Sequence, residues 1–245
     1  MAALRRTSPR AKAKIDLAAS RESQNKLSNS RYLFFGGKGG VGKTTAAAAT
    51  AFHLFTNSTV ERSILLFSTD PAHSLADSLG VAVGNALTEV ARRKGSRIVA
   101  FEMDAGIALE KFRAQHGPVL AEIAERGTFL DESDISELLN LSLPGMDEVM
   151  ALFELSELDR SGEFHHVIVD TAPTGHTARL LQLPQIFERM VTALDRMSDK
   201  HRYIVAQFAR RTTRNDPVDL FLSDLRDRIK RVQALLHNRE STRFA

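Results

Sequence analysis

Short apolar runs alternate with longer amphipathic stretches from residue 31 onward. Four of these runs are predicted as buried strands because they are short, mostly apolar and bounded by polar residues. They are Tyr32–Phe35, Ser63–Thr69, Arg97–Met103 and His166–Val169. Helical patterns fill the intervals, over residues 43–56, 73–79, 106–126 and 144–158. This alternation predicts an α/β fold with a mostly parallel sheet and helices on both faces.

Two helical regions are predicted as insertions on this core, at about residues 105–163 and 177–239. The first contains an acidic segment, Asp131–Asp134, and the second carries an apolar stripe at spacings of four and three residues. The stripe comprises Val218, Leu222, Leu225, Ile229, Val232 and Leu236. Such a stripe indicates one helix of about six turns that packs on the domain. The last residues, Ser241–Ala245, look like the start of another strand, so we expect the sheet to be incomplete at this end.

Composition narrows the class of protein. With 245 residues, of which 43% are hydrophobic, the chain can build one substantial core, and we treat residues 31–245 as one domain. No apolar run has the length of a membrane-spanning helix, so we expect no direct membrane insertion. The absence of cysteine excludes disulfides and thiolate metal ligands. A cytoplasmic protein is therefore expected.

The basic charge is concentrated in residues 1–30. Seven basic and two acidic side chains give this leader a charge of +5, which leaves −2 on the remaining residues of a chain with net charge +3. Its polar composition without apolar periodicity predicts a disordered tail. A misassigned start codon and an organellar transit peptide are alternatives. Aromatic residues that could stack on bases are missing from the leader, so we expect no nucleic-acid partner.

A glycine-rich decamer follows the first predicted strand. Residues 36–45 contain Gly37, then four residues, then Gly42-Lys43-Thr44, the spacing of a phosphate-binding P-loop. Glycines let successive backbone N–H groups surround an anion, and the start of the next helix adds further donors. In this pattern the lysine reaches the β- and γ-phosphates and the threonine hydroxyl binds Mg²⁺. The residues expected to bind the phosphates are Gly37, Lys38, Gly39, Gly40, Val41, Gly42, Lys43, Thr44 and Thr45.

Three further charged residues extend this site. Lys38 is either a solvated loop lysine or a cation aimed at phosphate oxygens, in its own site or across a dimer interface. Asp70, at the end of the second predicted strand, could orient or deprotonate an attacking water, or could instead cap the helix at 73–79. Asp170 follows three apolar residues at the end of the fourth strand, as expected of a carboxylate that holds Mg²⁺ through water together with Thr44. Parallel strands end at one edge of the sheet, so these motifs should converge on one active site.

Together these segments resemble the ArsA-type anion-pump and tail-anchored-protein-targeting ATPases, a dimeric group of P-loop NTPases with a deviant Walker A motif. The segments that carry the resemblance are Lys38–Thr44, Asp70–Ser74, Asp170–Thr177, Leu180–Pro184 and Pro144–Glu148. The resemblance implies Mg²⁺-dependent ATP hydrolysis, with Lys38 reaching the partner's nucleotide and Asp70 as the catalytic carboxylate. It also implies a homodimer that couples its nucleotide state to a hydrophobic client protein or to a membrane transporter.

Two departures from the family leave alternatives open. The chain stops before the adenine-contacting residues of the family and before the cysteine pair that binds zinc in some members. A nucleotide-binding scaffold with little turnover is therefore one alternative. An arsenite-efflux ATPase is another, but a chain without cysteine lacks the thiolates that soft metalloids favour. We expect no histidine metal site at His165 and His166, because neighbouring residues of a strand point to opposite faces.

An apolar helical segment could contact the client. It contains Phe187, Met190, Val191, Leu194 and Met197. Methionine-rich helices form adaptable binding surfaces, but ordinary core packing explains the same pattern.

Overall fold

The computed structural model of the chain describes residues 29–58, 60–70, 74–127, 145–171, 182–189, 191–196 and 216–245. The predictions for the basic leader, for the acidic segment at 131–134 and for Met190 and Met197 lie outside these residues. So do residues 71–73 and 172–181, which belong to the segments after Asp70 and Asp170.

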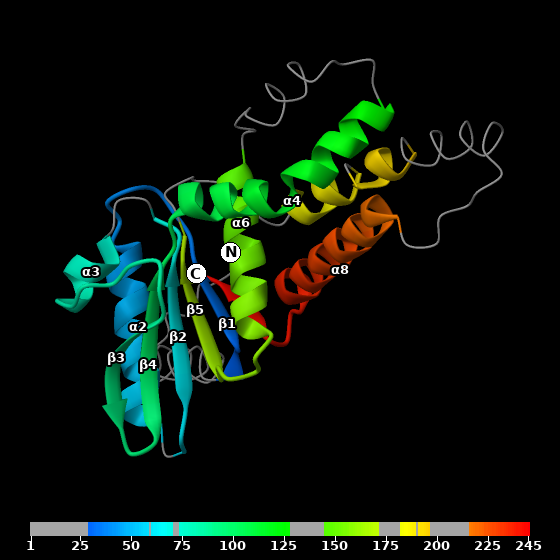
Figure 1. The fold of residues 1–245 in the computed structure, drawn as a ribbon. Helices are drawn as coiled ribbons and strands as arrows, with labels where there is room; N and C mark the ends of the chain where they lie inside the picture. Colours follow the sequence, from blue (N-terminus) through cyan, green and yellow to red (C-terminus); the bar gives the residue numbers. More distant parts are fainter. Residues whose placement is uncertain are drawn as a thin grey trace, which may run out of the picture.

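The described part of the chain forms a sheet flanked by helices on both faces (Figure 1). Its strands are β1 (Tyr32–Phe35), β2 (Ser63–Ser68), β3 (Thr88–Arg93), β4 (Ser96–Glu102), β5 (His166–Asp170) and β6 (Thr242–Phe244). Its named helices are α2 (Lys43–Asn57), α3 (Ser74–Leu79), α4 (Ala105–Gly127), α6 (Met146–Asp159) and α8 (Pro217–His237). The strand order is β3-β4-β2-β5-β1-β6, and all neighbours pair in parallel except β3 with β4. The predicted α/β class with a mostly parallel sheet is confirmed.

The predicted strands and helices match the observed ones to within two residues at most boundaries. β2 ends at Ser68 rather than Thr69, and β4 begins and ends one residue earlier than predicted. Each of these strands is short and almost wholly buried, because both faces of a parallel sheet are covered. A continuous apolar run is therefore a reliable sign of a central strand here.

The two faces of the sheet bury separate apolar clusters. Alternate strand residues such as Leu33 and Ile168 pack with α2 and α3, whereas Phe34 and Val169 pack with α4, α6 and α8. Figure 1 shows the same division, with α2 and α3 on one side of the sheet and the other three helices on the opposite side. This period-two alternation follows from the pleat of the strands.

Strand β3 was missed by the sequence analysis. It is an antiparallel edge strand, half-buried at best, and it carries the exposed pair Glu89 and Arg92. A tight turn joins it to β4, and both turn residues, Lys94 and Gly95, have positive φ (47° and 80°). Positive φ at both positions is the signature of a type I′ hairpin, whose twist suits the strands that it joins.

The predicted stripe in the C-terminal region is confirmed as a helix packing on the domain. All six of its residues in α8 are buried, on the face of the sheet that α4 and α6 also cover. Asp216 caps this helix, since its side chain accepts a hydrogen bond from the N–H of Val218 (3.0 Å). The predicted opening of a further strand is β6, whose Phe244 stacks on Phe34 with ring centroids 5.0 Å apart. That 105–163 and 177–239 are insertions stays a prediction.

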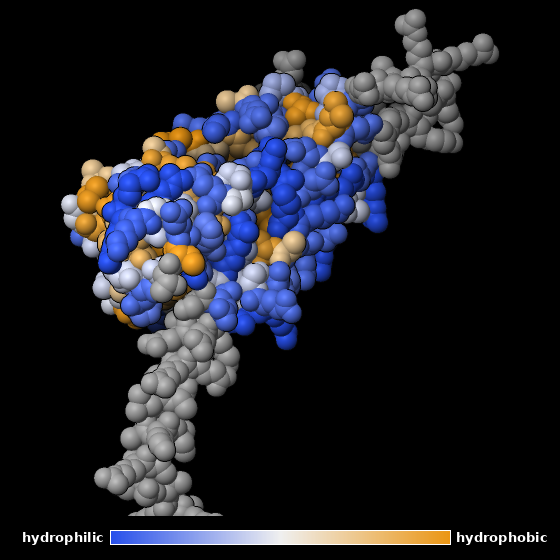
Figure 2. All heavy atoms as spheres, turned by 90° about the horizontal axis from the view of Figure 1, so that it is seen from below, coloured by the Kyte–Doolittle hydropathy of each residue, from blue (hydrophilic) through white to orange (hydrophobic). Residues whose placement is uncertain are grey.

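The surface gives no sign of a membrane-spanning element in the described residues. None of their helices combines the length and the hydrophobicity that crossing a bilayer requires. Figure 2 shows the face seen from below Figure 1, which is mainly hydrophilic with small, separated apolar patches. The cytoplasmic location stays a prediction.

Candidate functional site

Strand register brings the predicted motifs to one edge of the sheet. The last residue of β5, Asp170, lies opposite Phe35 of β1 on one side and opposite Ser68 of β2 on the other. Further backbone bonds tie the residues after these strands together: Thr69 donates to the Asp170 carbonyl (3.0 Å), and Thr171 donates to the Phe35 carbonyl (3.1 Å). The glycine loop after β1 and the segment after β2 therefore flank the end of β5.

The glycine loop has a backbone shape that depends on glycine. Gly37, Gly40 and Gly42 have φ values of 144°, 77° and 87°, in the region where side chains are strained. Gly42 is the N-cap residue of α2 and has no side chain to satisfy the first N–H groups of the helix. Backbone donors at a helix start that no side chain caps are suited to an anion such as a phosphate.

Lys43 lies beneath this loop. Its side chain is buried, and Nζ donates a hydrogen bond to the carbonyl of Lys38 (3.3 Å). An ammonium group held beside the glycine loop is suited to a ligand with several negative oxygens. The side chains of Lys38, Val41 and Thr45, in contrast, are exposed to solvent.

Thr44 and Asp170 are in direct contact. The hydroxyl Oγ1 of Thr44 donates to Oδ2 of Asp170 at 2.7 Å, and both side chains are buried. Burial raises the pKa of the Asp170 carboxyl, and the negative charge of Asp70 raises it further, whereas the hydrogen bond from Thr44 and the charge of Lys43 oppose the rise. A nearby cation would relieve this cost of burying the carboxylate.

The oxygen atoms at this point fit a magnesium ion. Oδ1 of Asp170 is buried and makes no hydrogen bond with the described residues. An unpaired buried carboxylate oxygen beside a threonine hydroxyl is the kind of donor set that Mg²⁺ takes alongside phosphate and water oxygens. No group of three or more histidine, aspartate or glutamate side chains that could hold a metal by itself occurs among the described residues. The donor set therefore suits an ion that arrives with a nucleotide.

Asp70 joins the same cluster through Ser68. The Ser68 hydroxyl donates to Oδ2 of Asp170 (3.4 Å) and accepts a hydrogen bond from the N–H of Asp70 (3.2 Å). Asp70 is 8% exposed and close enough to act electrostatically on Asp170. Asp70 was also considered as a cap of the following helix. At the start of α3, however, the N–H of Leu75 donates to the side chain of Glu102 (3.2 Å).

The sequence analysis missed three polar residues of this edge. Ser68 and Glu102 were treated as parts of apolar strands, although a buried polar residue at a strand end is itself a signal. Thr171 was quoted only within a longer motif, and its hydroxyl donates to the Phe35 carbonyl (2.8 Å), which fixes the distance between β1 and β5.

His165 and His166 lie at the opposite edge and bind separately. The Nδ1 atom of His165 accepts a hydrogen bond from the N–H of Ser63 (3.1 Å). His166 is buried, donates from Nδ1 to the Ser30 carbonyl (2.9 Å) and accepts at Nε2 from Arg62. Each ring therefore has its own partners.

Comparison with known proteins agrees with this geometry. A sequence model described as anion-transporting ATPase matches residues 30–245. The protein named ATPase GET3 of Mycosarcoma maydis is 32% identical over 218 residues, which cover 87% of this chain and 61% of that protein. ATPase get3 of Schizosaccharomyces pombe is 33% identical over 217 residues, with 87% and 62% covered. ATPase GET3 of Malassezia globosa is 36% identical over 162 residues, with 66% and 45% covered.

The chain thus matches between about half and three fifths of the length of these curated relatives. The expected resemblance is confirmed, and each of these relatives is named an ATPase. Because the family match covers nearly all described residues, this chain belongs to the anion-transporting ATPase family.

Proposed function

We propose that this chain binds ATP with Mg²⁺ and hydrolyses the terminal phosphate. The observation that carries the proposal is the row of contacts Thr44–Asp170–Ser68–Asp70 beside the glycine loop. It supports the proposal because phosphoryl transfer needs a phosphate cradle, a cation ligand and a carboxylate for the attacking water at one place.

Different residues of the site contact the phosphates, the Mg²⁺ ion and the attacking water. The backbone N–H groups of the glycine loop and the ammonium of Lys43 bind the phosphate tail. Thr44 and, through water, Asp170 would hold Mg²⁺, which neutralises charge on the β- and γ-phosphate oxygens when bound. The Asp70 carboxylate orients a water molecule and accepts its proton while the water oxygen attacks the γ-phosphorus and the bond to the bridging β–γ oxygen breaks.

Lys38 has a different position from Lys43. Its exposed side chain belongs to the tip of the loop, where it is accessible to a second subunit. We therefore propose a homodimer in which Lys38 reaches the phosphates bound by the partner subunit and stabilises the charge that develops there.

Coupling to a hydrophobic client is the finer part of the proposal. The segment suggested as a client surface contains Val191, which is buried, and Phe187 and Leu194, which pack against the core. For these three residues core packing is the observed role, so client binding by this segment would require its helices to move. Asp substitutions at Phe187 and Leu194 that leave the capture of an apolar transmembrane peptide unchanged would exclude this segment as the client surface.

Phosphate release with Mg²⁺ and ATP tests the enzymatic proposal. Asp70→Asn keeps the size of the side chain but removes the base, so the rate should fall by roughly 10²–10⁴-fold. Asp216→Asn is the matched control, because it makes the same change at the cap of α8, where asparagine serves as well as aspartate. Equal rates in the wild type and in Asp70→Asn would exclude the catalytic role, and nucleotide binding without any phosphate release by the wild type would favour the scaffold alternative.

A further inference from the structure

Glu102 is a buried carboxylate that belongs neither to the glycine loop nor to the proposed magnesium ligands. It is the last residue of β4, only 2% exposed, and follows the apolar residues Ile98–Phe101. Its strand position is opposite Ser68, the residue that bonds both Asp170 and the N–H of Asp70. A carboxylate rarely occupies such a buried position unless it makes specific hydrogen bonds.

The carboxylate of Glu102 fixes the start of α3. Its Oε1 accepts the hydrogen bond from the backbone N–H of Leu75 (3.2 Å), and its own N–H donates to the Gly84 carbonyl (3.0 Å). The Leu75 side chain is fully buried in the apolar cluster under α2. Backbone and side chain therefore both hold residue 75 in place.

Asp70 lies between this anchor and a second one. Before it, the N–H of Thr69 donates to the Asp170 carbonyl (3.0 Å) and the N–H of Asp70 donates to the Ser68 hydroxyl (3.2 Å). After it, the first hydrogen bond in the described part of the chain is that of the Leu75 N–H to Glu102. A segment of a few residues that is fixed at both ends samples far fewer conformations than one fixed at a single end.

We propose that Glu102 is a positioning residue that, through its hydrogen bond to Leu75, holds Asp70 where it can act on the attacking water. The inference rests on the proposed ATP hydrolysis, since it assigns Glu102 a share in the placement of the catalytic carboxylate. It adds a residue from β4 to a site otherwise built from β1, β2 and β5.

Two substitutions separate the hydrogen bond from the charge. Glu102→Ala removes the acceptor, so the N–H of Leu75 loses its partner. Glu102→Gln keeps an oxygen acceptor at the same place without the negative charge. Ser96→Ala, at the other end of β4, is the matched control, because it removes a buried hydroxyl that accepts from the Arg62 N–H (3.0 Å) far from the site.

Steady-state phosphate release is the first measurement. Glu102→Ala should lower kcat by about tenfold or more, while KM for ATP should stay within about twofold, because the glycine loop is intact. Glu102→Gln should restore kcat to within about threefold of the wild type, and Ser96→Ala should change neither constant. A wild-type kcat in Glu102→Ala, or an equal fall in Glu102→Gln and Glu102→Ala, would overturn the positioning role.

Hydrogen exchange of single backbone amides is the second measurement, and it needs no turnover. In Glu102→Ala, exchange should accelerate at Thr69 and Asp70 as well as at Leu75, and in Glu102→Gln and Ser96→Ala it should match the wild type at these amides. Acceleration confined to Leu75 would mean that Glu102 caps α3 without positioning Asp70. If the wild type releases no phosphate, the proposed function fails, and the exchange data still decide whether Glu102 positions Asp70.

Discussion

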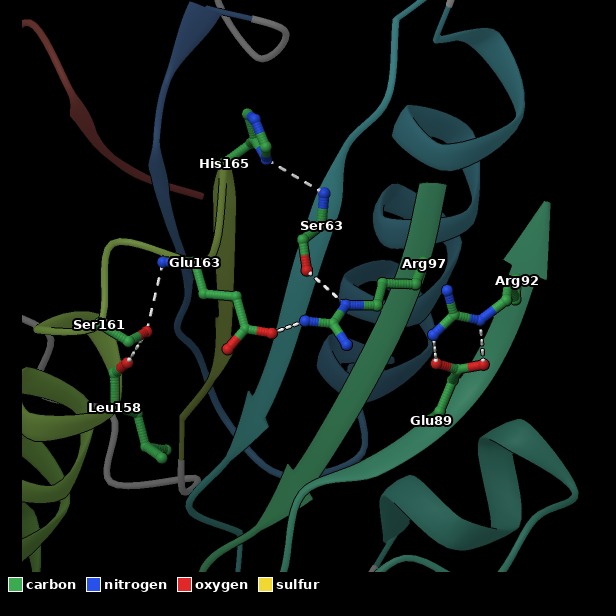
Figure 3. A network of polar contacts seen from close by, with 8 residues as sticks. All are labelled: Ser63, Glu89, Arg92, Arg97, Leu158, Ser161, Glu163 and His165. Atoms are coloured by element: carbon green, nitrogen blue, oxygen red, sulfur yellow. Dashed lines mark hydrogen bonds and ion pairs between the residues drawn. The ribbon is translucent and has the colours of Figure 1, made fainter. Parts of the chain in front are cut away.

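At the amino ends of the strands polar side chains pair with one another, whereas at the carboxyl ends a buried carboxylate oxygen makes no hydrogen bond with the described residues. Figure 3 shows part of the first edge, where Arg97 lies between the Ser63 hydroxyl (3.0 Å) and the carboxylate of Glu163. At the second edge Oδ1 of Asp170 is buried and finds no hydrogen-bond partner in the described part of the chain, beside a loop whose glycines have positive φ. The pairs of the amino edge stabilise the fold, and the carboxyl edge is where we propose that the ligand binds.

The same contrast appears in the neighbouring residues of each edge. At the amino edge, Asp159 accepts hydrogen bonds from Arg31 (2.7 Å) and from the hydroxyl of Tyr32. At the carboxyl edge, the ammonium of Lys43 donates to a backbone carbonyl, that of Lys38, rather than to a carboxylate. Substitutions at the two edges should therefore act on different observables, activity at one and stability at the other.

Among the substitutions that compare the two edges, removing the carboxylate of Asp170 should have the largest effect. Asp170→Ala should lower Mg²⁺ affinity or Mg²⁺-dependent turnover by about 10–100-fold, because it removes the oxygen that fits the hydrated ion. Titration of activity with Mg²⁺ at fixed ATP checks this. Nucleotide binding measured without Mg²⁺ is the control and should change little, whereas an unaltered Mg²⁺ dependence would remove Asp170 from the ion site.

The two lysines of the loop should differ in binding. Lys43→Ala should weaken ATP binding by roughly tenfold or more, since a hydrogen bond to a charged group contributes about 1.5–3 kcal/mol. Lys38→Ala should spare binding to the monomer and reduce turnover. Calorimetric titration with a non-hydrolysable ATP analogue makes the comparison, and equal losses of affinity in both variants would contradict the action of Lys38 across a dimer.

At the amino edge, His166→Leu should lower the free energy of unfolding by about 1–3 kcal/mol at pH 7.5, because the Ser30 carbonyl and Arg62 lose their partner. It should also change the pH dependence. Burial lowers the pKa of His166, and the charges of Arg62 and His165 lower it further, although the hydrogen bond to Ser30 opposes this. Neutral His166 therefore stabilises the fold above the ordinary histidine pKa, and this contribution is lost as the pH falls toward the lowered value.

Urea unfolding between pH 7.5 and pH 5 tests that sign. The wild type should lose stability on acidification, and the slope should be weaker in His166→Leu. Some slope should persist, because burial also lowers the pKa of His116.

The smallest effect is expected for the ion pair of Figure 3. The side chains of Arg97 and Glu163 are 29% and 42% exposed, so solvent screens their attraction. Arg97→Ala should cost only about 0.2–1 kcal/mol in unfolding free energy and leave phosphate release unchanged. A loss of turnover in this variant would show that the two edges are coupled.

The sequence predicts the strands that are buried on both faces. It misses the edge strand, which is recognisable only from its pairing with a neighbouring strand. β1 and β5 are found because Leu33, Phe34 and Val169 belong to unbroken apolar runs. β3 is not found because its exposed face carries Glu89 and Arg92, and its turn, Lys94-Gly95, lacks the asparagine or aspartate typical of such hairpins.

The candidate site divides in the same manner. Lys43, Thr44 and Asp170 stand in motifs whose spacing is visible along the chain. Ser68 and Glu102 acquire their roles only from the register that sets β2 beside β4 and β5, and register is a property of the paired strands. Long-range partners of this kind cannot be inferred from local sequence.

Strand β6 offers a way to watch the nucleotide loop from outside the site. The N–H of Gly36, at the entry of the loop, donates to the Ala245 carbonyl (3.0 Å), and the N–H of Ala245 donates to the Phe34 carbonyl (2.8 Å). The chain contains no tryptophan, so Phe244→Trp would introduce a single indole fluorophore stacked on Phe34. Its emission would report movements of the loop entrance when nucleotide is added.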